Sequence, residues 1–239
     1  MPAYTLAPTD TVIAPDGTIL YRIQYADGTR GGYLQSTANL DPTSDAQVLG
    51  DAQVSGNAWV SGNARVSGDA RVSGNAQVSG NAWVSGNARV SGNAQVSGNA
   101  WVSGDAWVYG GARVLGDARV LGDARVSGNA QVSGNAQVSG NAQVSGDAWV
   151  YGDAWVYGDA RVSKPQHCLT VGPLGSRAAT LTVCRDSTLS LSYATGCFFG
   201  SREAFLAAVE ATHGDSPIGN VYAAAVMLAD HVVPPYTQE

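Results

Sequence analysis

The residues best suited to binding chemistry recur at every sixth position of a long central segment. From Gln47 to Arg161 these twenty positions hold only glutamine, arginine or tryptophan, in seven, seven and six copies. Tryptophan and arginine dominate the binding energy of many interfaces. Arg beside Trp can also hold a phosphate or a nucleobase. The candidate binding residues are Trp83, Trp101, Trp107, Arg71, Arg89 and Arg125.

The same pattern also has a neutral explanation. The codons CAG, CGG and TGG encode Gln, Arg and Trp and differ by single bases. A recently duplicated repeat could therefore drift among these three residues without selection. Stacked rows of similar side chains would in addition stabilise the fold by themselves. The sequence leaves both explanations open.

Residues for catalysis or metal binding are scarce. All three histidines lie outside the repeated segment, at His167, His213 and His231. The cysteines Cys168, Cys184 and Cys197 show no CxxC spacing, so we predict small core residues rather than metal ligands. Their odd number suits a reducing cytosol. We therefore predict no catalytic residue, no metal and no cofactor, and we expect a protein that is not an enzyme.

The element that positions the candidates is a hexapeptide repeat. From Asp45 to Ser163 the unit [D/N]-A-x-V-[S/L/Y]-G recurs without insertion or deletion, with Gly111 replacing the first residue once. In a strand, Ala and Val point to one side and x to the other. Gly followed by Asn or Asp favours a corner. A calcium-binding β-roll needs nine-residue units and is excluded. Three units make one triangular coil of about 18 residues, and coils stack at about 4.8 Å.

Grouping the outward residues by eighteen gives three faces. Face one carries Gln47, Arg65, Trp83, Trp101, Arg119, Gln137 and Trp155. Face two carries Gln53, Arg71, Arg89, Trp107, Arg125, Gln143 and Arg161. Face three carries Trp59, Gln77, Gln95, Arg113, Gln131 and Trp149. Trp83 and Trp101 fall on adjacent coils, so their rings are expected to stack.

Both ends of the stack need caps, because open coils expose unpaired strand edges. Residues 1–44 predict a small β cap, with strands over 18–25 and 33–35 and a turn at 26–28. Residues 164–239 predict a small α+β domain with a loose tail after Val233. Its strands are expected at 168–171, 179–184 and 189–193. Its helices are expected at 202–212, with Ser201 as the N-cap, and at 218–231.

The repeat resembles the hexapeptide-repeat family, whose coils wind left-handed. The resemblance implies a mainly β fold, a left-handed parallel β-helix of twenty hexapeptides over residues 45–163. Its best-known members are trimeric acyltransferases that use a catalytic His and carbonic anhydrases that bind zinc through histidines. This β-helix has no His, which argues against both activities.

The flanks carry short motifs of their own. They are Gly31-Gly32-Tyr33-Leu34-Gln35-Ser36 and Asn39-Leu40, and near the C-terminus Gly172-Pro173-Leu174-Gly175-Ser176, Thr180-Leu181-Thr182, Gly196-Cys197-Phe198 and Thr212-His213-Gly214-Asp215. With these motifs the chain resembles small hexapeptide-repeat proteins of phages and prophages. This resemblance covers the whole chain. The similarity implies a phage or prophage origin and does not indicate a mechanism.

Charge and hydropathy narrow the functions further. An isoelectric point near 4.9 argues against general nucleic-acid or anionic-membrane binding. The sequence predicts no signal peptide and no membrane span. We expect a phage-encoded binding module in the host cytosol, with an anti-defence role against a host protein or a nucleotide-type ligand. The alternatives are a virion-associated spacer and an acyltransferase-like enzyme. A homo-oligomer, with a trimer favoured, is expected.

Overall fold

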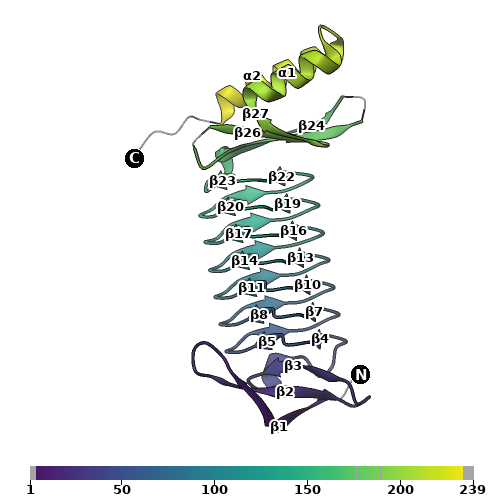
Figure 1. Ribbon diagram of the computed structural model, residues 1–239, viewed down its shortest axis with the longest axis vertical. Helices are drawn as coiled ribbons and strands as arrows, with labels where there is room; N and C mark the ends of the chain where they lie inside the picture. Colours follow the sequence, from purple (N-terminus) through teal and green to yellow (C-terminus); the bar gives the residue numbers. More distant parts are fainter. Residues whose placement is uncertain (1–3, 176, 189, 234–239) are drawn as a thin grey trace.

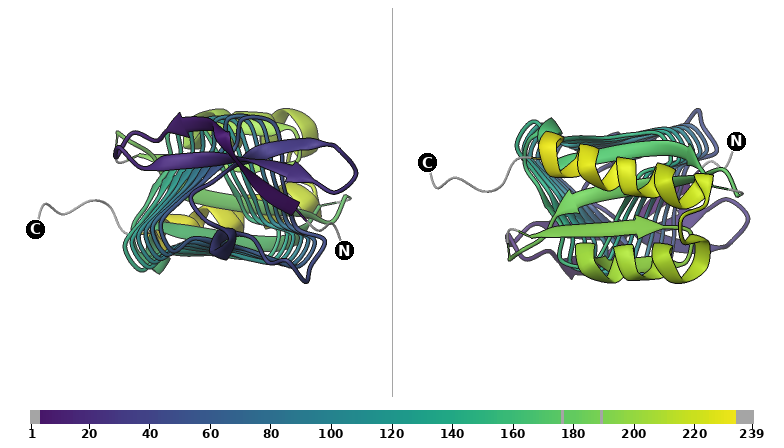
Figure 2. Two further views of the ribbon diagram at one scale, coloured as in Figure 1. Left: turned by 90° about the horizontal axis from the view of Figure 1, so that it is seen from below. Right: turned by 90° about the horizontal axis from the view of Figure 1, so that it is seen from above.

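A computed structural model describes residues 4–175, 177–188 and 190–233. It is a rod in which a stack of coils lies between an N-terminal β unit and a C-terminal layer of sheet and helices (Figure 1). Seen along the rod, the coils superpose as a three-sided outline (Figure 2). The predicted mainly β fold with a parallel β-helix is confirmed.

Each predicted face is one parallel sheet of two-residue strands. Face one consists of β4 (Gln47–Val48), β7 (Arg65–Val66), β10 (Trp83–Val84), β13 (Trp101–Val102), β16 (Arg119–Val120), β19 (Gln137–Val138) and β22 (Trp155–Val156). Face two consists of β5 (Gln53–Val54), β8 (Arg71–Val72), β11 (Arg89–Val90), β14 (Trp107–Val108), β17 (Arg125–Val126), β20 (Gln143–Val144) and β23 (Arg161–Val162). Face three consists of β6 (Trp59–Val60), β9 (Gln77–Val78), β12 (Gln95–Val96), β15 (Arg113–Val114), β18 (Gln131–Val132) and β21 (Trp149–Val150).

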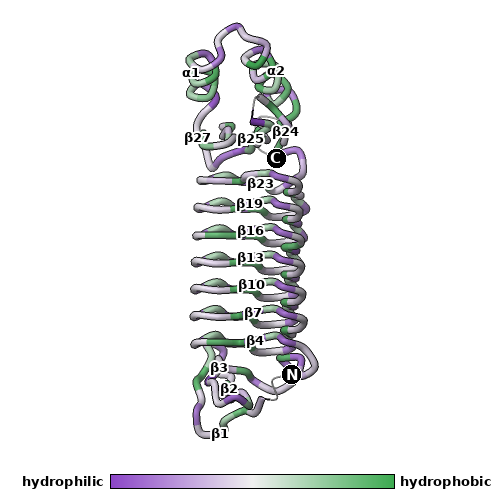
Figure 3. The backbone as a smooth tube through the Cα atoms, turned by 90° about the vertical axis from the view of Figure 1, so that its right-hand side faces the viewer, coloured by the Kyte–Doolittle hydropathy of each residue, from purple (hydrophilic) through white to green (hydrophobic). Residues whose placement is uncertain are grey.

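The interior of the rod is a column of alanine and valine. All Ala and Val of the repeat, from Ala46 to Val162, are at most 2% exposed, and the hydropathy colouring repeats from coil to coil (Figure 3). The nineteen corner glycines from Gly50 to Gly158 all have φ between +58° and +77°. That backbone region is open to glycine and costly for residues with a Cβ.

The corner asparagines add a ladder of side-chain hydrogen bonds. The Nδ2 of an Asn donates to the Oδ1 of the Asn or Asp eighteen residues later, at 2.7–3.1 Å. The donors are Asn57, Asn63, Asn75, Asn81, Asn87, Asn99, Asn129, Asn135 and Asn141. Sequence reasoning assigned these residues to corners only. In the fold they also hold neighbouring coils in register.

The N-terminal cap is an antiparallel sheet of β1 (Tyr4–Ile13), β2 (Ile19–Tyr25) and β3 (Arg30–Leu34), followed by the 3₁₀ turn η1 (Thr37–Asn39). Strand β3 pairs with β5, so the cap extends the sheet of face two. The first strand was not predicted. Its pairing with β2 is irregular between Ala7 and Thr11, around Pro8, and a proline inside a run argues against a regular strand.

Three contacts close the first coil. The Tyr25 hydroxyl donates to the carbonyl of Val48 at 3.2 Å and accepts from its amide at 3.0 Å. The buried Asn39 amide donates to the carbonyls of Gly56 and Ala58, at 3.0 and 2.9 Å. Strand β3 covers the remaining edge. The backbone groups that an open end would expose are therefore satisfied at these positions.

The C-terminal unit is a four-stranded antiparallel sheet with two helices on its far side (Figures 1 and 2). After the 3₁₀ turn η2 (Pro165–His167) come β24 (Cys168–Leu174), β25 (Ala179–Arg185), β26 (Leu191–Thr195), β27 (Phe198–Ser201), α1 (Arg202–His213) and α2 (Pro217–Val232). The Ser201 hydroxyl caps α1 by accepting from the Ala204 amide, as predicted. Strand β27 was not predicted, and Leu189 and the tail after Val233 lie outside the described residues.

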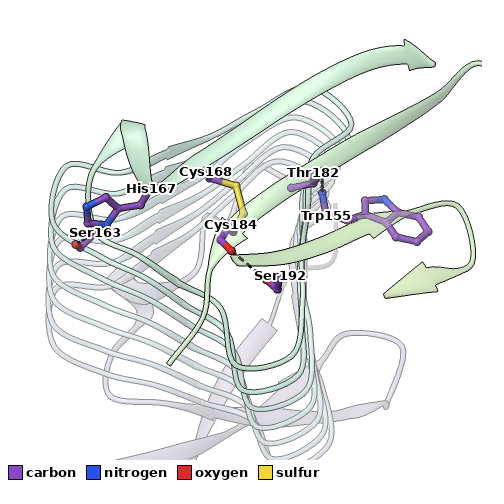
Figure 4. Close-up of a disulfide and its surroundings, with 7 residues drawn as sticks. All are labelled: Trp155, Ser163, His167, Cys168, Thr182, Cys184 and Ser192. Atoms are coloured by element: carbon purple, nitrogen blue, oxygen red, sulfur yellow. Dashed lines mark hydrogen bonds between the residues drawn. A yellow bond between two sulfur atoms is a disulfide. The ribbon is translucent and has the colours of Figure 1, made fainter. Parts of the chain in front are cut away.

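The sheet closes the last coil and corrects the interpretation of the cysteines. Thr182 Oγ1 accepts from the Trp155 amide at 2.9 Å, and Cys184 packs on the end of the Ala/Val column (Figure 4). Cys184 is joined to Cys168 by a disulfide. The two face each other on the antiparallel strands β24 and β25, a proximity that sequence spacing does not reveal. The prediction of small core residues is confirmed for Cys184, which is 2% exposed, and is wrong for Cys197, which is free and exposed. The pairing of Cys168 with Cys184 was not predicted.

Candidate functional site

The six candidate binding residues do not form one site. Trp83 and Trp101 lie on face one, whereas the other four lie on face two. On face two, Arg71, Arg89, Trp107 and Arg125 occupy consecutive strands in register. Faces one and two therefore have to be considered separately.

On face one, the tryptophans satisfy one another. The rings of Trp83 and Trp101 stack at 5.4 Å between centroids and 8° between planes, as predicted. Their indole N–H groups donate to Ser67 Oγ at 3.1 Å and Ser85 Oγ at 3.3 Å. The Arg119 guanidinium lies 6.0 Å from the Trp101 ring centroid. Because the indole donors are already used, this row is well explained as a stabilising ladder.

On face two, the outward residues form the floor of a groove of about 230 Å³. One wall is a row of serines from the adjoining corner, Ser55, Ser73 and Ser91. Tyr109, the residue in the same column one coil beyond Ser91, packs against Trp107 at 5.0 Å between ring centroids. The described lining consists of Ala14, Pro15, Asp16, Gln53, Ser55, Arg71, Val72, Ser73, Arg89, Ser91 and Trp107.

The opposite wall is the turn between β1 and β2. The amide of Gly17 donates to the carbonyl of Ala14 at 2.9 Å, and the Thr18 amide donates to Asp16 Oδ1 at 3.0 Å. Ala14, Pro15 and Asp16 of this turn line the groove together with residues of the first four strands of face two. Sequence reasoning missed these residues. The signal was present, because Ala-Pro-Asp-Gly-Thr is a typical turn sequence, but the sequence does not show where the turn docks.

The groove is positively charged at its centre. Arg71 and Arg89 are register partners on adjacent strands, and among the described residues neither makes a salt bridge. The Arg89 guanidinium lies 5.8 Å from the Trp107 ring centroid. Asp16 is the one carboxylate in the described lining, and its hydrogen bonds from Thr18 lower its pKa, so it is ionised at neutral pH.

Two neighbouring guanidinium groups repel each other until an anion lies between them. Trp107, 36% exposed, offers a flat ring surface, and the serine row offers hydroxyl donors and acceptors. The arrangement suits a ligand with a planar ring and an anionic group. No cluster of three His, Cys, Asp or Glu able to hold a metal occurs among the described residues. No helix in the described part of the chain has the length and apolarity needed to cross a membrane.

The β-helix resembles a known repeat family. The family model described as YdcK Beta solenoid repeat matches residues 52–68, 64–80, 94–110, 124–140, 130–146, 136–152 and 142–158. No curated protein matches the chain. The matched segments and the coil architecture together show that the chain is a repeat β-helix protein, similar in its repeats to the YdcK beta solenoid.

Proposed function

We propose that the chain is a non-catalytic binding protein whose ligand lies in the groove of face two. The observation that supports this most strongly is that Arg71, Arg89 and Trp107 line one groove together with residues of the β1–β2 turn. Drift within the repeat explains residue types at x positions, but it does not explain a separate segment that lines the groove beside this stretch of one face. The groove thus favours selection over drift on face two.

The ligand chemistry follows from the groove. A nucleotide places its base against Trp107 and its phosphate between the two guanidinium groups. An acidic segment of a host protein with an aromatic side chain would present the same two features. The nucleotide is the preferred ligand because the groove is short and is closed on one side by Pro15 and Asp16.

Calorimetric titration with the four nucleoside monophosphates tests the proposal. The double variant Arg89→Gln/Trp107→Gln should weaken binding at least about tenfold, because each lost contact with a charged or stacked group removes roughly 1–3 kcal/mol. The matched control is Arg113→Gln/Trp59→Gln on face three, which removes the same residue types. Equal affinities in both variants, or no binding by the native chain, would sink the proposal.

The runner-up function is a virion-associated spacer. It is favoured by the stiffness of the rod, whose coils are joined by backbone ladders and by the Asn ladder at the corners. The two functions differ in location. A chain that blocks a host factor acts in the host cytosol, where cellular thiols reduce accessible disulfides. A spacer is found in purified particles, and mass spectrometry of such particles separates the two.

The origin and assembly belong to the same proposal. The flanking motifs around Gly31 and Thr212 support a phage or prophage source. The exposed aromatic side chains support a homo-oligomer, with a trimer favoured, because aromatic surface of this kind is commonly covered. Light scattering tests the oligomer: Trp83→Gln/Trp101→Gln should lower the molecular mass if face one forms the contact. An unchanged mass would mean that Trp83 and Trp101 only stack on each other within the chain and form no contact between copies.

A further inference from the structure

The far end of face two holds a second cavity, at the junction with the C-terminal sheet. It has a volume of about 240 Å³. Its polar lining comes from three parts of the chain, the last coils of the β-helix, the 3₁₀ turn η2 and the end of strand β25 with the residue after it. The residues that bear on its chemistry are Ser145, Arg161, Ser163, His167, Arg185 and Asp186.

Two arginines from different strands, Arg161 of β23 and Arg185 of β25, line this cavity. Arg161 is the outward residue of the last hexapeptide, and its Nη1 donates to Gln143 Oε1 at 3.1 Å. Arg185 ends β25 and is only 6% exposed. A guanidinium cannot be deprotonated under ordinary conditions, so a positive charge is held at the wall of the cavity with little bulk water around it.

His167 contributes a further donor. Its Nδ1 accepts from the Ser163 amide at 3.3 Å and lies 3.1 Å from Ser163 Oγ (Figure 4). An Nδ1 that accepts an N–H carries no proton, so the neutral ring bears its proton on Nε2. Burial lowers the pKa of His167, and the charges of Arg185 and Lys164 lower it further. At neutral pH the ring is therefore a hydrogen-bond donor without charge.

The one carboxylate in the described lining is held through one oxygen by its own turn. Asp186 Oδ1 accepts from the Thr188 amide at 2.8 Å, the Thr188 hydroxyl at 2.7 Å and the Ser190 amide at 3.1 Å. These bonds hold Asp186 within its own turn. The described lining thus carries two guanidinium groups against one carboxylate, together with hydroxyls, which is an environment for an acceptor-rich anion.

We propose that this junction cavity binds a phosphate group, held by Arg161 and Arg185 and by the hydroxyls of Ser145 and Ser163. This site is separate from the groove of face two and shares no residue with it. Arg125, on the same face between the two cavities, lines neither of them.

The test uses the full-length protein and inorganic phosphate as the probe, at constant ionic strength set with chloride. The readout is the imidazole resonances of His167 in long-range ¹H–¹⁵N spectra, assigned with His167→Gln. Arg161→Gln is the test variant, because the repeat already carries Gln at this type of position and Arg161 is exposed. Arg125→Gln is the control, with the same loss of charge on the same face.

Saturable shifts of the His167 resonances are expected in the native protein. The dissociation constant should rise about tenfold in Arg161→Gln, as expected for loss of a charge-assisted hydrogen bond. The dissociation constant should change by less than about twofold in Arg125→Gln. Arg125 lies two coils before Arg161, and salt screens the charge of an exposed residue over that separation. Absence of shifts, or equal weakening in both variants, overturns the proposal. Neither result bears on nucleotide binding in the groove, which is measured separately.

Discussion

The contact between corner glycines leads to a prediction with a matched control inside the same β-helix. At Gly98, where φ is +77°, an added Cβ would lie 2.8 Å from the carbonyl oxygen of Gly116, 2.9 Å from its nitrogen and 3.0 Å from its Cα. At Gly122, where φ is +67°, the nearest atoms are the nitrogen, oxygen and Cα of Gly140, at 3.4, 3.6 and 3.8 Å. The two glycines therefore share a backbone conformation and differ in the space that is available for a Cβ.

The expected difference in stability between the two alanine variants follows from this difference in space. Alanine in the left-handed region costs about 1–2 kcal/mol at either site, so this contribution cancels in the comparison. At Gly98 the overlap is with backbone atoms that cannot rotate away, so the two coils must separate. Separation stretches the hydrogen bond from the Asn99 amide to the Gly116 carbonyl, now 2.8 Å. Overpacking of this kind costs about 1–3 kcal/mol, and Gly98→Ala should be less stable than Gly122→Ala by that amount.

Thermal unfolding followed by circular dichroism measures the effect. A difference of 1 kcal/mol shifts the Tm of a chain of this size by roughly 2–4 °C. With an extra penalty near 2 kcal/mol, Gly98→Ala should melt roughly 4–8 °C below Gly122→Ala. Equal melting temperatures, or the reverse order, would refute the view that coils touch through their corner glycines.

Three further predictions test other parts of the fold. Val96→Asp should be severely destabilising and Gln95→Asp nearly neutral, because Val96 is fully buried and an unpaired buried charge is costly; similar urea midpoints would contradict the assignment of inward and outward residues. Deleting residues 81–98 removes one coil and keeps the register, whereas deleting only 81–89 places a corner where a strand belongs; equal melting temperatures would contradict the coil length. Folding lowers the pKa of His167 from 6.5, so the unfolded chain binds more protons between the folded value and 6.5. The stability from this group is complete above pH 6.5 and falls as the pH drops through that window. Urea midpoints measured across the window should show a slope that His167→Gln lacks, and an identical slope would refute the assignment.

The sequence predicted the β-helix well because its period carries the geometry. Six residues per unit placed Val96 inside and Gln95 outside, and the eighteen-residue interval put Trp83 over Trp101. These are local consequences of strand alternation and corner spacing.

Other features depend on contacts between distant segments, which a single sequence does not show. The turn at Asp16 could be recognised, but not that it docks beside Arg71 and Arg89 to form a groove. The Cys168–Cys184 pairing depends on how β24 and β25 align. The candidate list therefore contained the floor of the groove and missed its wall.

We propose that the repeated core determines the fold while face two carries the ligand. The most direct test measures thermal unfolding and nucleotide titration on one set of samples. One variant replaces the groove residues Arg71, Arg89 and Trp107 with Gln; its control replaces Trp59, Arg113 and Trp149 on face three with Gln. Both variants should keep the melting behaviour of the native chain, and only the face-two variant should lose nucleotide binding. Retained binding in the face-two variant, or equal loss in both, would contradict the proposal.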